Sequence, residues 1–511
     1  MPRKPKPFNL KLAEALKAAK KAARNGHVLK SKDLDWRTRE LLTSAGWLVP
    51  IYAGWYVLGN PSEDMIEEST VAYYSNYWEF LSKYLDDRLG DRSWCLGPLA
   101  SLKIWTDDLT IPTQISIQTM NNINDVISFP HDSSAVITAS NTLNSNDILR
   151  EKDLNILKLE RVLSRLPLIE QTNPSPSTMA VLAMIKDTSK LAKHLIDENN
   201  KSLSGRLIAL LELTGNQSAA KELARYLRLA RFEYKEDDID RSSRISFRPH
   251  SVSIVGTKYK ALWQEMSQQI RNHGTPQPKS FRSFEDLKEL TKKKYVKDAY
   301  NSLSIEGYQV TEEQIGRIAR GEYNAGIHDH DKNIHNALAA KGYHLAFNSV
   351  LTSLEKIVTE KKPVYQVVME DLMEWRSLLF QPYADSGLLK PSDLIGYRSG
   401  RVNIRGSRHT PLPPEKILDA MEALQENIRE EENPWVRALL AHHQFVNIHP
   451  FCDGNGRTAR FLMNVLFVSS GFPWVIIDHT KRTHYFDCLE AAHIENDGTK
   501  FSDFIRNEII L

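Results

Sequence analysis

The chain is poor in cysteine, in long apolar runs and in net charge of either sign. Its 511 residues include three cysteines, Cys95, Cys452 and Cys488, and none of them forms a CxxC pair. This spacing argues against a disulfide framework and against a structural zinc site. No apolar run approaches the ~20 residues of a membrane-spanning helix, and none follows the basic N-terminus as in a signal peptide. We therefore expect a cytoplasmic protein with no membrane partner.

The formal net charge is only +2, yet the first 32 residues contain ten Lys or Arg and one Glu. Helices are expected over residues 9–24 and 36–44, and the segment GWLVPIYAGWYVLGNP predicts two short strands. Residues 1–60 therefore resemble a winged helix-turn-helix domain. Such a domain binds DNA or a protein, and both alternatives stay open. The candidate DNA contacts are Lys17, Lys20, Lys21 and Arg24 of the first helix and Arg37 and Arg39 of the second.

The remaining chain divides by pattern into three stretches. Residues 61–240 predict a small α/β piece followed by helices, with TVAYYSNYWEFLSKYL as a helix and LTIPTQISIQTM and SSAVITAS as strands. In its order of elements, the N-terminal half resembles AbiEi-type antitoxins of toxin–antitoxin systems. Polar segments predict a connector over residues 241–282. From residue 283 to 511 the pattern is strongly helical.

The segment HPFCDGNGRTAR, from His449 to Arg460, concentrates polar groups that carry chemistry. The residues before it predict a helix capped by Asn433 that ends near His449–Pro450, because a residue before proline is pushed out of the helical region. A second helix is expected to start near Arg457. The segment is therefore a loop that opens a helix, where unpaired N–H groups and the helix dipole attract anions.

Two residues of this loop suit proton transfer and metal binding. His449 has a side chain that titrates near neutral pH, as a general base requires. Asp453 offers a hard oxygen ligand for Mg²⁺. Taken alone, each fits equally well a plain loop with helix caps and an ion pair.

The other polar residues of the loop suit the binding of phosphates. Gly454 and Gly456 let the backbone approach a ligand and can adopt positive φ, and Asn455 offers an amide donor. Arg457 and Arg460 share one face of the second helix and can hold separate phosphates. As a set, these residues indicate phosphoryl or nucleotidyl transfer to a hydroxyl group.

The segment matches, at every defined position, the signature HPFx(D/N)GNGRxxR of the Fic family, and residues 283–511 resemble that family. The resemblance implies an all-α Fic (Fido) domain with a β-hairpin flap, so that the whole chain is expected to be mainly α. It implies a protein adenylyltransferase that moves AMP from ATP to a Ser, Thr or Tyr hydroxyl of a protein, its own included, and releases pyrophosphate. Both motif glycines are retained, which favours transfer of AMP over transfer of phosphate.

The resemblance also assigns roles by position. His449 would take the proton of the target hydroxyl, and Asp453 would bind Mg²⁺ between the α- and β-phosphates. Arg460 would reach the γ-phosphate. The anion hole would be formed by Gly454, Asn455, Gly456 and Arg457.

Further ATP contacts are implied outside the motif. The flap would lie over the nucleotide and pair its strand edge with the target backbone; it comprises Val402, Asn403, Ile404 and Arg405. On the other side, Tyr485 and Phe486 would line the adenine pocket, although both fit plain core packing equally well.

An inhibitory segment is implied upstream. In NSLSIEGYQ, the residues Ser302, Glu306 and Gly307 match the family pattern (S/T)xxxE(G/N). The resemblance implies that Glu306 pairs with Arg460, and its charge would repel a triphosphate. Autoinhibition is the expected resting state. The rival hypothesis is a DNA-binding, antitoxin-like transcriptional regulator whose Fic domain only senses nucleotide.

Overall fold

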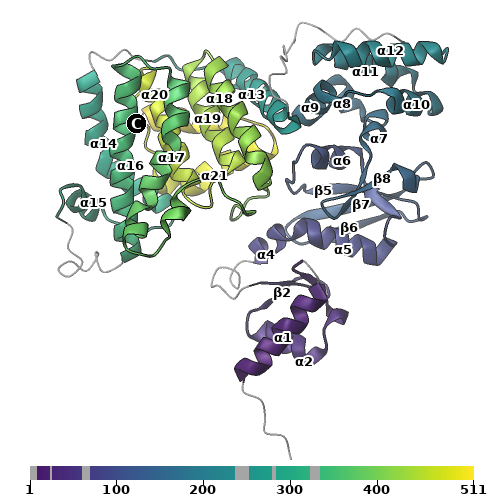
Figure 1. Ribbon diagram of the computed structural model, residues 1–511, viewed down its shortest axis with the longest axis horizontal. Helices are drawn as coiled ribbons and strands as arrows, with labels where there is room; N and C mark the ends of the chain where they lie inside the picture. Colours follow the sequence, from purple (N-terminus) through teal and green to yellow (C-terminus); the bar gives the residue numbers. More distant parts are fainter. Residues whose placement is uncertain are drawn as a thin grey trace, which may run out of the picture. The chain divides into compact units, whose positions relative to one another are not determined.

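The computed structural model describes residues 8–23, 26–59, 69–235, 253–278, 284–322 and 334–510. By internal contacts the chain divides into two units. Unit 1 comprises residues 1–244 together with 403–410, and unit 2 comprises residues 245–402 and 411–511. Figure 1 shows the elements of both units in chain order.

Unit 1 begins with two helices and a three-stranded antiparallel sheet of order β1-β3-β2. The elements are α1 (Phe8–Ala23), β1 (Val28–Lys30), η1 (Ser31–Asp33), α2 (Trp36–Ser44), β2 (Leu48–Tyr52) and β3 (Trp55–Leu58). Asp35 caps α2 by accepting a hydrogen bond from the Thr38 N–H at 3.0 Å. Both predicted helices and both predicted strands are present, and β1 is an additional strand that the sequence did not reveal.

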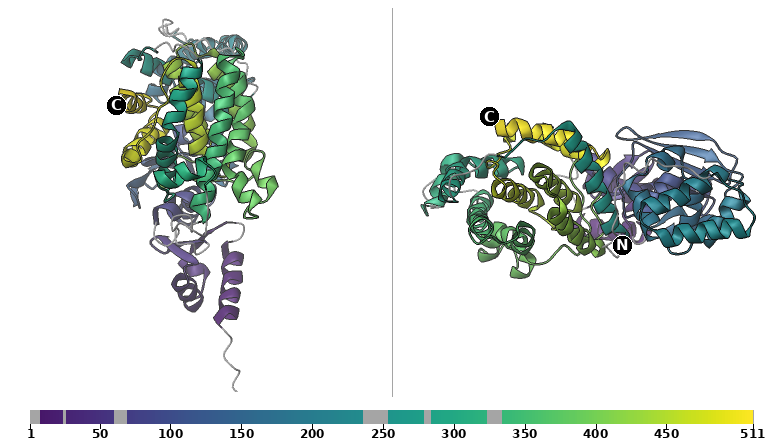
Figure 2. Two further views of the ribbon diagram at one scale, coloured as in Figure 1. Left: turned by 90° about the vertical axis from the view of Figure 1, so that its left-hand side faces the viewer. Right: turned by 90° about the horizontal axis from the view of Figure 1, so that it is seen from above.

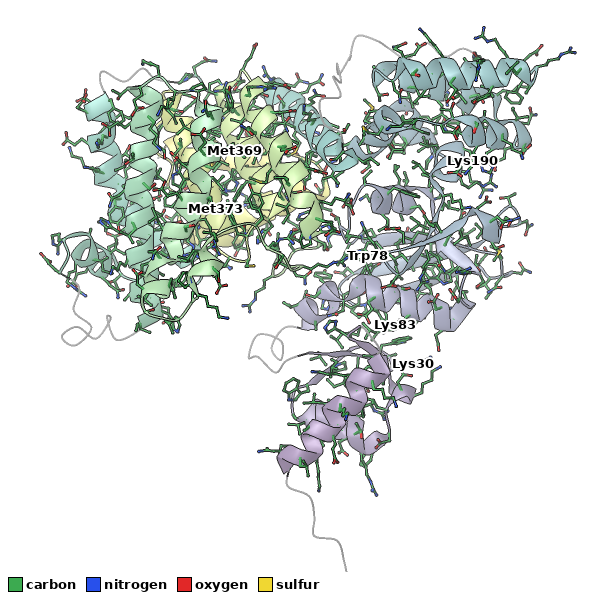
Figure 3. All side chains as sticks on the ribbon, in the orientation of Figure 1. Lys30, Trp78, Lys83, Lys190, Met369 and Met373 are labelled. Atoms are coloured by element: carbon green, nitrogen blue, oxygen red, sulfur yellow. The ribbon has the colours of Figure 1, made fainter. Side chains whose placement is uncertain are left out.

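The core of this first part continues beyond the predicted boundary at residue 60. Val28 and Trp55 are buried in the same cluster as Phe80. The Glu79 carboxylate accepts a hydrogen bond from the Val28 N–H at 3.0 Å, and Lys83, labelled in Figure 3, donates to the Val28 carbonyl at 2.8 Å. The small sheet is therefore anchored to the α/β piece.

The α/β piece contains a four-stranded sheet of order β4-β5-β7-β6, in which β5 and β7 are parallel and the other pairs antiparallel. Tyr73 and Tyr77 are fully buried, so both rings pack in the core of this piece. Strands β4, β6, β8 and β9 were not predicted. The elements are α4 (Ser69–Ser75), α5 (Tyr77–Leu89), β4 (Trp94–Leu96), α6 (Pro98–Trp105), β5 (Gln114–Thr119), β6 (Asp125–Phe129), β7 (Ser133–Ala139), η2 (Ser145–Asp147), β8 (Ile148–Glu151) and β9 (Leu154–Leu157).

A helical layer completes unit 1, as the sequence predicted. Its helices are α7 (Leu159–Ser164), α8 (Leu168–Thr172), α9 (Pro176–Met184), α10 (Ser189–Asp197), α11 (Lys201–Leu213) and α12 (Gln217–Leu229). All of them except α8 contribute to one buried apolar cluster, which includes Leu191, Leu207 and Leu223.

Unit 2 contains helices and no strand in its described part, in agreement with the predicted fold class. Helix α20 packs against α16, α17 and α19, and α14 lies alongside α16 (Figures 1 and 2). The elements are α13 (Ile254–His273), α14 (Phe284–Ile305), α15 (Glu312–Ala319), α16 (Ile334–Val358), α17 (Val364–Asp385), η5 (Pro391–Leu394), η6 (Pro414–Lys416), α18 (Ile417–Glu430), α19 (Pro434–Ile448), α20 (Asn455–Ser469), η7 (His479–Lys481), α21 (Arg482–Ile494) and α22 (Thr499–Ile510).

The prediction of a connector over residues 241–282 was wrong in its central part. Residues 254–273 form α13, and Tyr259, Trp263 and Met266 are buried in the core of unit 2. Their spacing of three or four residues is that of a helix face. Polar segments on both sides of this short apolar stripe concealed it.

All three cysteines are free, as predicted; Cys95 and Cys488 are buried and Cys452 is exposed. None of the helices in the described part of the chain combines the length and apolar character that a bilayer crossing requires.

Candidate active site

The predicted loop lies between two packed helices of unit 2. The Asn433 side chain caps α19 by accepting hydrogen bonds from two N–H groups of its first turn, and Pro434 occupies the first helical position. Helix α19 ends at Ile448. His449 then adopts the left-handed conformation with φ 52°, and after the loop Gly454 does the same with φ 85°. Two left-handed residues thus bracket the turn from α19 into α20.

The imidazole of His449 has a defined tautomer. Its Nδ1 lies 3.2 Å from the carbonyl oxygen of Val446. A carbonyl can only accept, so Nδ1 donates this bond, and in the neutral ring the lone pair lies on Nε2. Nε2 is therefore the nitrogen that can take a proton from a substrate.

The loop is held in shape by Asn455. Its buried amide donates to the Phe451 carbonyl at 2.8 Å and accepts from the Phe451 N–H at 3.0 Å. The Asn455 side chain, which was predicted to donate to a ligand, thus closes the loop instead. What Asn455 can offer to an anion is its backbone N–H in the first turn of α20. Gly454 has no room for a side chain, because a Cβ there would lie 2.8 Å from the Phe380 ring.

Arg457 is a buried cation with unused donors. Its side chain is 1% exposed, and within the described residues its Nε and Nη1 have no hydrogen-bond partner. Asp453 lies 3.6 Å from Nη2, and the rings of Tyr308 and Phe380 lie 5.3 and 5.0 Å from the guanidinium. Burial alone would lower the pKa of Arg457, but Tyr308, Asp453 and Glu306 outweigh it and raise the pKa. A permanently charged group with unsatisfied donors at a helix N-terminus is suited to an anionic ligand.

Asp453 has the exposure that a metal ligand needs. Its side chain is 64% exposed, and one of its oxygens accepts the Gly454 N–H at 2.5 Å. In the described ranges, no three His, Cys, Asp or Glu residues gather as a metal-binding group. A single carboxylate suits Mg²⁺ that shares its coordination with substrate phosphates and water.

Arg460 donates hydrogen bonds to Ser302 and Glu306, two of the residues predicted to be inhibitory. Its Nη2 donates to Oε1 of Glu306 at 2.7 Å and to the Ser302 carbonyl at 3.0 Å, and its Nε donates to Ser302 Oγ at 2.9 Å. Burial would raise the pKa of Glu306, but Arg460, Arg457 and His449 outweigh it and lower the pKa, so Glu306 is charged. Gly307, with φ 91°, ends this segment in the left-handed region.

The same carboxylate also reaches the start of α20. A Cβ built on Gly456 would lie 2.5 Å from Oε1 of Glu306. Gly456 is helical, so its predicted positive φ is absent; what it provides is space. Glu306 thus occupies the position over the first turn of α20 where an anion would bind.

Comparison with known proteins identifies this region. Residues 366–467 match the model of the Fic/DOC family. The chain contains a Fic domain. This confirms the family expected from the motif.

Several relatives share a longer stretch with the chain. The protein adenylyltransferase Fic of Drosophila melanogaster is 30% identical over 223 residues, which are 43% of this chain and 41% of the relative. The protein of the same name from Drosophila grimshawi is 29% identical, with 43% and 42% covered. The chain therefore spans less than half the length of these relatives.

Two solved structures are similar at a lower level. The Fic-1 fragment of C. elegans covers 69% of this chain and 90% of its own, with 18% identity and a TM-score of 0.37. A Fic domain containing signaling protein of Bacteroides thetaiotaomicron covers 49% and 94%, with 19% identity and a TM-score of 0.36.

The flap of the Fic domain differs from the prediction. No strand is assigned between residues 401 and 410; a turn at Arg405–Gly406 is closed by the Ser407 N–H, which donates to the Ile404 carbonyl at 3.1 Å. Val402 belongs to unit 2, whereas Asn403, Ile404 and Arg405 cluster with unit 1. Residues 401–410 therefore form a turn and not the predicted β-hairpin.

The predicted aromatic pair of the Fic domain divides into two environments. Tyr485 is 1% exposed, and its hydroxyl lies 2.8 Å from Nε2 of His442. Burial lowers the pKa of His442 well below its usual value, so the ring is neutral and accepts, and burial raises the pKa of Tyr485 to about 12. Phe486 is 37% exposed, with the Arg482 guanidinium 4.6 Å from its ring. Tyr485 is thus a core residue, whereas the Phe486 ring is partly exposed.

One supporting residue of the Fic domain escaped sequence reasoning. The guanidinium of Arg376 lies 4.9 Å from the Phe380 ring and 5.4 Å from the Phe451 ring, and it donates to the Asp393 carbonyl at 2.6 Å. It thereby supports the motif loop from α17. No local signal marks Arg376, since its partners are backbone and aromatic groups far along the chain.

The predicted DNA contacts differ in exposure and in their hydrogen bonds. Lys17, Lys20, Lys21 and Arg37 are exposed, whereas Arg39 donates to the Ser31 carbonyl at 2.6 Å and serves the fold. Arg24 lies outside the described residues.

Proposed function

We propose that this protein is a protein adenylyltransferase, which moves AMP from ATP to a protein hydroxyl, its own included, and which Glu306 inhibits. The observation that carries the proposal is the buried guanidinium of Arg457 at the start of α20, whose Nε and Nη1 have no hydrogen-bond partner among the residues that the structure describes. His449 presents the lone pair of Nε2 at the other end of the same loop. The name shared by the Drosophila relatives agrees with this assignment.

The chemistry follows from these groups. The target hydroxyl oxygen attacks the α-phosphorus of ATP, the bond to pyrophosphate breaks, and the hydroxyl proton passes to Nε2 of His449. Arg457 and the first N–H groups of α20 stabilise the charge that develops on the phosphates. Asp453 would hold Mg²⁺, which neutralises phosphate charge when bound.

Glu306 inhibits by occupying this site. Its carboxylate takes the Nη2 donor of Arg460 and lies over the first turn of α20. A triphosphate must displace it, because two anions cannot share the same donors at close range.

The test uses the Glu306→Gly variant with Mg²⁺ and ATP labelled on either the α- or the γ-phosphate. We expect the α-label alone to appear on protein. Added His449→Ala should abolish the signal, whereas His273→Ala, an exposed histidine bonded to Asp503 at 2.9 Å, should not change it. Transfer of the γ-label would indicate a kinase instead, and absence of both labels would refute transferase activity.

A second function is favoured by the exposed lysines of α1. Lys17, Lys20 and Lys21 lie on a helix next to a three-stranded sheet, as in a DNA-binding winged domain. If they contact phosphates, replacing all three with Gln reduces the salt dependence of duplex binding by about one unit of slope per lysine. The matched control replaces Lys292, Lys293 and Lys297, which are exposed on α14. Equal effects of the two triple variants would exclude a DNA surface on α1.

A further inference from the structure

Arg398 is buried, and among the described residues its side chain donates hydrogen bonds to backbone carbonyls only. Its Nε donates to His449 at 2.8 Å, its Nη1 to Gly400 at 2.9 Å and its Nη2 to Leu412 at 2.5 Å. A longer contact of 3.5 Å joins Nη2 to the Ile448 carbonyl. The residue is 4% exposed.

The backbone of Arg398 is tied to the same loop. Its N–H donates to the Pro450 carbonyl at 2.9 Å. Arg398 thus contacts the carbonyls of three consecutive residues, Ile448, His449 and Pro450. Ile448 directly precedes the Fic motif, and the other two are its first residues.

The charge of Arg398 is placed at the end of a helix. Burial lowers the pKa of this guanidinium, and none of its hydrogen bonds goes to a carboxylate. Two of its acceptors, Ile448 and His449, stand at the C-terminus of α19, where carbonyls lack helical partners and the dipole is negative. The helix end therefore offsets the burial of the cation.

We propose that Arg398 is a positioning residue for transfer, which locks the left-handed backbone of His449 to both ends of the segment between Gly400 and Leu412. The planar guanidinium donates in fixed directions, so it sets the carbonyls of His449, Gly400 and Leu412 at fixed mutual distances. A lysine has a single nitrogen and cannot reproduce that geometry. This inference rests on the proposed function, because it assigns Arg398 to the orientation of the base His449.

Arg437 offers a matched control at the opposite end of α19. It is also an arginine whose pKa is lowered by burial and which donates to a backbone carbonyl, through Nε to Glu431 at 2.8 Å. It lies in the first turn of the helix, away from His449. Replacing it with lysine disturbs a comparable buried cation without touching the motif.

The experiment compares Arg398→Lys and Arg437→Lys in the Glu306→Gly chain. We expect Arg398→Lys to reduce the transfer rate at saturating ATP about a hundredfold, since small misplacements of a catalytic group cost that much. The dissociation constant for ATP should change less than about threefold, because Arg457 and α20 are untouched. Arg437→Lys should leave both quantities within about threefold of the parent.

Amide hydrogen exchange supplies a readout that does not depend on activity. The His449 N–H donates to the Phe445 carbonyl at 3.0 Å, and its exchange should accelerate in Arg398→Lys alone. Should Arg398→Lys fail to fold, Arg398→Gln, which keeps one amide donor, takes its place.

Equal transfer rates or equal exchange in the two lysine variants would overturn the role of Arg398. So would a loss of ATP affinity that parallels the loss of rate. A Glu306→Gly parent that transfers no label overturns the proposed function and this inference with it, so the two failures are distinguishable.

Discussion

Nη2 of Arg460 donates a hydrogen bond of 2.7 Å to Oε1 of Glu306, across 154 positions of sequence. On the other side of the guanidinium, Nε donates to the hydroxyl of Ser302, one helical turn before Glu306. The end of α14 therefore holds the arginine at two points. If a triphosphate binds at α20 as proposed, both contacts must adjust, and their separate contributions can be measured.

Ser302→Ala should weaken inhibition without abolishing it. It removes the hydroxyl that accepts from Arg460 Nε, while the Ser302 carbonyl and Glu306 keep their bonds to Nη2. A hydrogen bond to a charged group contributes about 1.5–3 kcal/mol, so basal transfer should rise about tenfold and remain below that of Glu306→Gly. The measurement is the initial rate of label transfer, with Ser304→Ala on the same helix as control. A rate equal to that of the unmodified chain would show that Glu306 alone holds the arginine.

Gly456→Ala should couple energetically to Glu306. Alanine stabilises a helix interior by up to about 1 kcal/mol relative to glycine, but here its Cβ would meet Oε1 of Glu306 at 2.5 Å. We expect the substitution to stabilise the Glu306→Gly chain and to destabilise the unmodified one. The four unfolding free energies form a double-mutant cycle with a coupling of about 1 kcal/mol or more. Additive values would mean that the carboxylate is not held over the helix.

Asp298 should make stability depend on pH. It is 5% exposed, accepts from the Tyr343 hydroxyl at 2.7 Å, and burial raises its pKa from 3.8 to about 6 despite Arg460 and Lys294 nearby. Between these values the folded chain binds a proton that the unfolded chain has lost. Stability is therefore lost as pH rises through this window, by about 3 kcal/mol.

The comparison of Asp298→Asn with the unmodified chain isolates this effect. The asparagine retains an acceptor for Tyr343 but does not titrate. The variant should therefore gain stability relative to the unmodified chain as pH rises, by about 2–3 kcal/mol of unfolding free energy between roughly pH 4 and pH 7. A difference that is the same at both pH values would show that Asp298 titrates normally.

Arg457→Met should separate stability from ligand binding. The guanidinium is buried, and two of its nitrogens have no hydrogen-bond partner among the described residues. Because burial of such a cation stabilises the fold little, its removal should change the melting temperature of the ligand-free chain by only a few degrees. The rise in melting temperature caused by Mg²⁺ and ATP should disappear. In the control Arg437→Met the rise should persist. A large loss of stability without ligand would mean that the rings of Tyr308 and Phe380 depend on the cation.

The sequence predicted the parts of the site that local rules determine. Pro450 ends α19, and the Asn433 cap and the start of α20 follow from capping and from glycine chemistry. The contact between Glu306 and Arg460 came from a family resemblance; no spacing rule would have found two residues in separate helices.

Arg398, Arg376 and Asp298 could not be identified from the sequence, because the groups around them come from distant parts of the chain. Arg398 and Arg376 bind backbone carbonyls, and a carbonyl leaves no mark in a sequence. Asp298 becomes unusual because folding buries it beside residues from other elements, among them Tyr343 of α16. The flap is the opposite case, in which the sequence predicted a β-hairpin that the structure does not form. Strand-forming side chains are not sufficient, because a strand also needs a neighbouring strand.

The clasp between Asn455 and Phe451 has a consequence for mutational surveys of this protein. Only a primary amide offers an oxygen and an N–H at the same reach, so aspartate, although similar in size, loses the bond donated to the Phe451 carbonyl, and leucine loses both bonds. A survey that scores only lost activity would therefore rank Asn455 with His449. The two losses would have unrelated origins, one in the architecture of the turn and the other in proton transfer.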